Sequence, residues 1–149
     1  MLGKRNTRGG AIAETGPSLL LLLVFIVFPL IDVLFIAAGW GMAWVLHRAE
    51  IREISVHRPA DWAAAKGKAD GEFYNGSIAN FLQIQPIASP DPVFTPDQAN
   101  PSDVMLTTKV AIRPMLYISV PGLANTPGLN APIPVSFTSS RPQEEKGRD

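Results

Sequence analysis

The residues that could perform chemistry are few in this chain. His47 and His57 are its two histidines, and cysteine is absent. His57 and Asp61 stand four residues apart, a spacing that can place two metal ligands on one face of a helix, but Pro59 interrupts such a helix between them. No local pattern brings a nucleophile beside a histidine or lysine base. We therefore expect structural histidines and no enzyme activity, metal site or cofactor.

Length and net charge exclude further classes of protein. The chain has 149 residues, with 13 basic and 13 acidic side chains. That length corresponds to one small domain. A zero net charge argues against a partner that is a nucleic acid, because nucleic-acid binders need a basic surface to meet phosphates.

The elements that must position any functional residue begin with a long apolar run. Residues 19–38 are interrupted only by Pro29 and Asp32. A helix of that length spans about 30 Å, the thickness of the hydrocarbon core of a bilayer. We therefore predict a transmembrane helix, with the lipid bilayer as a partner. Trp40 and Trp44 follow the run, where aromatic side chains anchor a helix at the membrane interface.

The orientation of this helix does not follow from its flanks, because each flank carries three basic residues. The bulk of the chain comes after the helix, which favours a cytoplasmic N-terminus and an extracytoplasmic C-terminal domain. The basic residues concerned are Lys4, Arg5 and Arg8 before the run, and Arg48, Arg52 and Arg58 after it.

A carboxylate, Glu14, stands just before the apolar run. Residues 4–14 read KRNTRGGAIAE, so a cut between Gly9 and Gly10 would make Glu14 the fifth residue. A short basic leader, a glycine and a glutamate at that position resemble the precursors of type IV pilins. Over about residues 8–50 the chain most resembles the TadE/TadF-like minor pseudopilins of the tight-adherence (Tad) pilus system. In that family another acidic residue commonly lies near the end of the apolar run, as Asp32 does here.

The resemblance implies a function in assembly. Residues 1–9 would be a leader removed by a prepilin peptidase in the bacterial inner membrane. The partners would be other pilin-like subunits and the inner-membrane assembly platform of the pilus. A carboxylate at the membrane boundary is costly unless it is paired, so Glu14 could pair with the new α-amino group of Gly10 in a neighbouring subunit. Glu14 could instead extend to water.

Asp32 follows Glu14 by 18 residues, which is about five turns of an α-helix. Both carboxylates would then lie on one face unless Pro29 bends the helix. Such a face would meet protein, since lipid disfavours it. Asp32 could alternatively be shielded by water or protonated.

The remainder of the chain predicts a small α+β domain. We expect the helix to extend through residues 10–58 and the domain to cover residues 59–138, with short helices at 60–69 and 72–84. Gly67 and Gly71 would interrupt the helical pattern. The two-residue period of 104–113 predicts a strand, and a second strand at 133–138 could pair with it antiparallel. Residues 85–103 read as a proline-rich loop, and 139–149 as a mobile polar tail.

Two alternatives to the assembly subunit remain open. The chain could be an uncleaved bitopic anchor whose outer domain binds another envelope protein. It could also be a secreted, small ligand-binding protein released by a cut after Gly39, because small residues precede that position. The position of the mature N-terminus separates the three possibilities.

Overall fold

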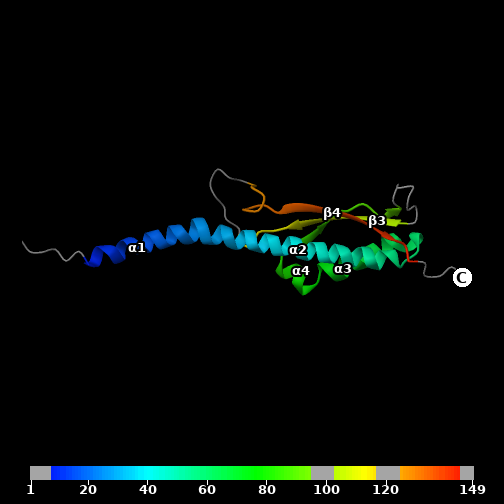
Figure 1. Cartoon of the computed structure of the whole chain (residues 1–149), viewed down its shortest axis with the longest axis horizontal. Coiled ribbons are helices and arrows are strands. Elements are labelled where there is room, and N and C mark those ends of the chain that lie inside the picture. The colour runs from blue at the N-terminus through cyan, green and yellow to red at the C-terminus, as the bar shows by residue number, and fades with distance from the viewer. Residues whose placement is uncertain (1–7, 95–102, 117–124, 145–149) are drawn as a thin grey trace, which may run out of the picture.

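One long helix forms the axis of the molecule. The structure, a computed structural model, describes residues 8–94, 103–116 and 125–144, with the side chains of 15–93, 103–116 and 125–144. Helix α1 (Arg8–Leu22), the π-helical turn η1 (Leu23–Val27) and helix α2 (Phe28–Ser55) follow one another without a break (Figure 1). The predicted helix that continues well beyond the apolar run is therefore confirmed.

Pro29 accounts for the π-helical turn. Proline has no amide hydrogen, and its ring clashes with the carbonyl four residues earlier, here that of Phe25. In η1 the amide of Phe28 donates to the carbonyl of Leu23, five residues back, so the extra residue is absorbed just before the proline. A wider turn shifts the phase of the helix by about one residue, or about 100°. The regular helical spacing between positions 14 and 32, on which the expectation of a shared face rested, is therefore interrupted by a wider turn.

An antiparallel sheet packs along one side of α2 (Figure 1). Strand β3 (Asp103–Ile112) is central and pairs with β4 (Ile133–Pro142) along its whole length. Strands β1 (Ile84–Ile87) and β2 (Val93–Phe94) pair with two separate parts of the other edge of β3. The predicted pairing of the two long strands is confirmed, and β4 continues to Pro142, beyond the predicted start of the polar tail.

Strands β1 and β2 lie largely in the segment predicted to be a proline-rich loop. That prediction was wrong at both places. Pro86 occupies an edge strand, where a residue without an amide hydrogen is tolerated because its other side faces outward. Pro90 and Pro92 lie between β1 and β2 rather than in them.

The opposite side of α2 carries the short helices (Figure 1). The 3-10 turn η2 (Pro59–Asp61) leads into α3 (Trp62–Tyr74), which is followed by α4 (Ser77–Phe81). Gly67 and Gly71 do not end α3, contrary to prediction. A side chain at either would meet no atom within 4 Å, and a helical glycine costs only about 1 kcal/mol relative to alanine. The chain turns instead at Gly76, where a Cβ would lie 3.3 Å from the carbonyl oxygen of Phe73.

Packing divides the long helix into two halves. The second half of α2 lies between α3 and the sheet and contributes to two clusters of buried residues. The first contains Ala43, Leu46, Tyr74, Ala79, Ile84, Val110 and Phe137, and the second Ile51, Ile54, Trp62, Ala65, Val104 and Leu106.

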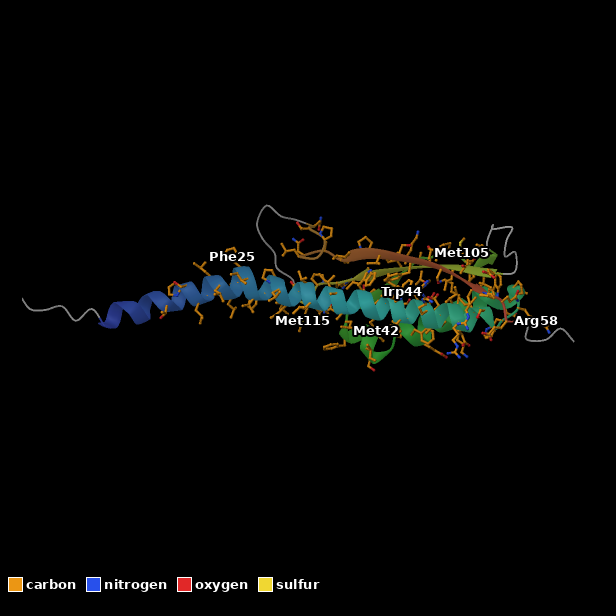
Figure 2. The ribbon with its side chains drawn as sticks, viewed as in Figure 1. Phe25, Met42, Trp44, Arg58, Met105 and Met115 are labelled. Atoms are coloured by element: carbon orange, nitrogen blue, oxygen red, sulfur yellow. The ribbon has the colours of Figure 1, made fainter. Side chains whose placement is uncertain are left out.

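The first half of the helix is bare as far as the described residues go. Phe25 is 71% exposed and extends from a part of the helix that no other element covers (Figure 2). The helix Thr15–Ser55 contains a window with mean hydropathy 3.1, of which 6% is buried, and is long and apolar enough to cross a membrane. Contacts with the domain begin at Asp32 and Phe35. By length and composition residues 15–34, about 20 residues, are enough to cross a bilayer, whereas the helix from His47 onward is packed within the domain.

Candidate functional site

A line of buried polar side chains joins α2 to the sheet. Ser139 Oγ on β4 lies 2.7 Å from His47 Nε2, and His47 Nδ1 lies 2.8 Å from Thr108 Oγ1 on β3. The Thr108 hydroxyl donates to Glu50 Oε2 at 2.8 Å. His47 and Glu50 are three residues apart and so project from one face of α2. We call Ser139, His47, Thr108 and Glu50 the polar relay.

The hydrogen bonds of the polar relay fix the position of each proton. Thr108 uses its single proton toward Glu50, so it accepts a hydrogen bond from Nδ1–H of His47. In a neutral imidazole the other nitrogen, Nε2, is then an acceptor, and Ser139 donates to it. Each side chain therefore donates a hydrogen bond to the next one, in the order Ser139, His47, Thr108, Glu50.

Burial keeps His47 neutral. Its side chain is fully buried, and its ring lies 5.8 Å from those of Phe137, on which it stacks, and Trp44. Loss of hydration, with a smaller contribution from the positive charge of Arg48, lowers the pKa of His47 from 6.5 to about 4. The imidazole therefore carries no charge at neutral pH.

Glu50 shows the opposite shift for the same reason. It is fully buried, and loss of hydration raises its pKa from 4.5 to about 7, against the hydrogen bond from Thr108 that lowers it. The charge of Asp70 also raises the Glu50 pKa, while Lys66 lowers it. Lys66 Nζ lies 4.0 Å from Glu50 Oε1 but 2.7 Å from Asp70 Oδ2, so Asp70 is the closer partner of the lysine.

Tyr74 completes the buried group around Glu50. Burial and the nearby carboxylate raise the pKa of its phenol, which stays protonated. Glu50 Oε1 and the Tyr74 hydroxyl are both buried and have no hydrogen-bond partner among the described residues. A proton on Glu50 would relieve the unpaired oxygen, which agrees with the raised pKa of this carboxyl.

Ser139 and His47 have the arrangement of a nucleophile and its base. A pKa of about 4, however, makes His47 a weak base at neutral pH. The imidazole is enclosed by aromatic rings, and Ser139 lies inside a regularly paired strand, opposite Leu106. The polar relay is therefore suited to fixing α2 against β3 and β4 in one register, since its hydrogen bonds form only when these three elements are aligned.

Sequence spacing could not reveal the polar relay as a unit, because Ser139 and His47 are 92 residues apart. One signal was present. The alternation of 104–113 places Thr108 on the same face as Val104, Leu106, Val110 and Ile112, and all five are buried. A hydroxyl on an apolar strand face needs a buried hydrogen-bond partner.

Asp32, predicted to face another subunit, is buried within its own chain. The amide of Leu116 donates to Asp32 Oδ1 at 2.8 Å. Its Oδ2 is buried and lacks a hydrogen-bond partner in the part of the chain that the structure describes. One oxygen of this carboxylate thus holds the segment that follows β3 against α2.

The two predicted interface tryptophans lie beside the sheet. The ring of Phe137 is 5.8 Å from that of Trp40 and 5.5 Å from that of Trp44. The guanidinium of Arg48 lies 4.8 Å above Trp44. Trp44 therefore packs in the domain, whereas Trp40 is 51% exposed. Their role as membrane anchors stays a prediction.

The predicted leader lies mostly outside the described residues. Gly9 and Gly10 fall in the first turn of α1, and Glu14 falls one turn later on the same helix. The Glu14 side chain is outside the described side chains, so its predicted pairing stays a prediction.

The second histidine is held locally. His57 Nδ1 lies 2.8 Å from the carbonyl of Glu53, and the indole of Trp62 donates to the His57 carbonyl at 3.1 Å. Among the described residues, no three histidine, cysteine or acidic side chains gather in a way that could hold a metal ion.

Comparison of the chain with models of protein families, with curated proteins and with solved structures found no match. Its function is therefore inferred from its own residues and geometry.

Proposed function

We propose that this protein is a single-pass membrane subunit of a pilin-like assembly, similar to the TadE/TadF-like minor pseudopilins of Tad systems. Its leader ends at Gly9 and is removed by a prepilin peptidase. The helix that follows packs against other pilin-like subunits and the assembly platform in the inner membrane. One observation carries the proposal: a continuous helix is bare in its first half and enclosed by its own domain in the second.

No described part of the chain covers the bare half of the helix. Its large apolar side chains are exposed on all sides of the helix, and lipid or other helices must cover them. Because the same helix continues into the packed core, its packing in an assembly also sets the position of the domain. The exposed side chains include Leu19, Leu20, Phe25, Ile26, Leu30, Val33 and Leu34.

Glu14 supplies the register between neighbouring helices in this proposal. Cleavage after Gly9 creates an α-amino group on Gly10, and a carboxylate at the membrane boundary gains most from such a partner. The cationic group exists only after cleavage, so processing and assembly are coupled through one ion pair.

The secreted alternative is disfavoured by the packing around Gly39. A cut after this residue would remove Asp32, which binds the amide of Leu116, and Phe35, whose ring lies 5.8 Å from that of Phe81. The uncleaved anchor remains a second candidate, because the Gly9–Gly10 bond lies inside the first turn of α1 and a peptidase cleaves an extended chain.

The first test is mass spectrometry of the N-terminal peptide from membrane-extracted protein. The proposal expects a chain that begins at Gly10. Gly9→Leu should block this cleavage, whereas Gly16→Leu, at a helical glycine with no atom within 4 Å of a built Cβ, should not. An intact N-terminus in the wild-type protein would establish the uncleaved anchor instead.

The second test addresses assembly. Glu14→Gln should leave membrane insertion and cleavage intact and weaken co-purification with other pilin-like subunits in mild detergent. Glu72→Gln, an exposed glutamate on α3, is the matched control and should co-purify normally. Equal co-purification of both variants would exclude the role assigned to Glu14.

A further inference from the structure

The contacts between the domain and α2 that lie nearest the bare part of the helix fall within a short stretch of α2. The contacts fall between residues 32 and 39, which is about 10 Å of helix. They come from three separate parts of the domain. Leu116 donates to Asp32, the ring of Phe81 lies beside that of Phe35, and Ile112 lies against Gly39. We call the end of the domain defined by these contacts the membrane-proximal end.

The depth of this end follows from the helix. When residues 15–34 fill the hydrocarbon core, the next stretch of helix lies in the headgroup layer, which is about 5–7 Å thick on each side of the core. The membrane-proximal end, which contacts residues 32 to 39, then extends from the edge of the hydrocarbon core into the headgroup layer. Figure 2 shows Met115 between Phe25, on the bare helix, and Met42, within the domain.

The exposed side chains at the membrane-proximal end suit this depth. Phe81 on α4 is 69% exposed, Trp40 on α2 51%, and Met115 after β3 48%. Large apolar side chains exposed from three separate elements at this end of the domain match the composition of a membrane interface. We call Phe81, Trp40 and Met115 the apolar rim.

A polar cavity of about 470 Å³ opens beside the apolar rim. Arg113, Gln83, Asn125 and Asn130 contribute to its lining, together with Met115. The guanidinium of Arg113 presents paired donors that match a phosphate, and amide side chains add neutral donors. The described lining includes no carboxylate, so its charge is that of Arg113.

The backbone around this cavity is also unusual. Gln83 and Asn125 have φ angles of 52° and 58°, and among the described residues no other non-glycine residue has a positive φ. Both line the cavity. Strained backbone tends to gather at ligand sites, where the surrounding structure enforces it.

We propose that this cavity binds the phosphate of an anionic phospholipid, with the apolar rim immersed beside it. A free phosphate has the same chemistry, but the cavity lies at headgroup depth, where lipid phosphates are concentrated. Bound lipid fixes the domain on the membrane surface at one height and tilt. The inference goes beyond the assembly role and depends on the membrane span alone, not on cleavage or on Glu14.

The immersion is tested with spin labels on the full-length protein. The chain has no cysteine, so Phe81→Cys and Met115→Cys each give one labelling site. Val93→Cys, on the 48% exposed side chain of β2, is the control at the far end of the sheet. In vesicles of phosphatidylcholine and phosphatidylglycerol, both rim labels should be relaxed more by oxygen than by a water-soluble nickel complex, and the Val93 label the reverse. Rim labels as accessible to nickel as the Val93 label would overturn the placement.

The lipid site is tested by native mass spectrometry of protein extracted with each lipid. Arg113→Gln should retain phosphatidylglycerol about tenfold less well than wild type, the loss expected for one charge-assisted hydrogen bond. Lys109→Gln removes an exposed cation from β3, the strand that Arg113 directly follows, and should retain phosphatidylglycerol normally. Equal retention by wild type and Arg113→Gln would overturn the proposal. Displacement of the lipid by inorganic phosphate alone would overturn its lipid specificity.

Discussion

The titrations of His47 and Glu50 should change the free energy of unfolding in opposite directions as the pH rises. Between pH 4.5 and 7, Glu50 is protonated in the folded protein and ionised in the unfolded one, so raising the pH favours unfolding. Between pH 4 and 6.5, His47 is neutral when folded and protonated when unfolded, so raising the pH favours folding. The two effects overlap and cancel over most of this range in the wild-type protein.

Replacing one of these two residues should reveal the pH dependence that the other contributes to the free energy of unfolding. One pH unit of pKa displacement corresponds to about 1.4 kcal/mol, so each shift is worth about 3 kcal/mol. The free energy of unfolding of Glu50→Gln, minus that of wild type, should rise by about 3 kcal/mol between pH 4.5 and 7. The reason is that wild type loses stability over this range as Glu50 titrates, and the variant does not. The same difference for His47→Gln should fall by about 3 kcal/mol between pH 4 and 6.5.

The assay is urea unfolding of the full-length protein in detergent micelles, followed by tryptophan fluorescence at several pH values. Taking the difference from wild type removes the titration of groups that both proteins share. Glu53→Gln, at an exposed glutamate one turn along α2, controls for the loss of one carboxylate. Differences for the two relay variants that do not vary with pH, or that vary with the opposite sign, would refute the burial argument.

Two further predictions concern the contact between α2 and the sheet. Thr108→Val leaves the Nδ1–H of His47 without its acceptor and should lower the free energy of unfolding by about 1–3 kcal/mol. Thr107→Val, on the outer face of β3, should lower it less. The urea midpoints of the two variants measure this difference. Gly39→Ala places a Cβ 2.8 Å from Cγ2 of Ile112 and should destabilise the folded protein by about 1–3 kcal/mol. Limited proteolysis of this variant should be faster than that of wild type. In the control Gly41→Ala the new Cβ meets no atom within 4 Å, so this variant should be as stable as wild type or more stable.

The spacing of apolar residues in the sequence predicted those elements whose apolar side chains all lie on one buried face. The alternation of 104–113 identified β3, because every second residue of that strand is buried against α2. The long apolar helix was equally clear. Strand β1 was missed because Pro86 breaks the strand pattern while occupying an outward edge position, and a single sequence does not show which strands lie at an edge.

The glycines illustrate the same limit at the level of single residues. Gly67 and Gly71 read as helix breakers but lie on an open face of α3, where the helix tolerates them. Gly76 lies between α3 and α4, where a Cβ would lie 3.3 Å from the carbonyl oxygen of Phe73. Composition alone does not distinguish a tolerated glycine from a required one, since the difference lies in the atoms that surround it.

The polar relay also fixes which part of the long apolar helix the domain covers. Apolar residues continue to Leu46, so hydropathy alone does not distinguish the bare part of the helix from the packed part. Among the described residues, the side chains of His47 and Glu50 are hydrogen-bonded to Ser139 and Thr108. Sliding α2 by one turn along its axis would unpair this network, at about 1–3 kcal/mol for each buried group left unsatisfied. The domain therefore holds α2 in one register through polar contacts that apolar packing alone would not specify.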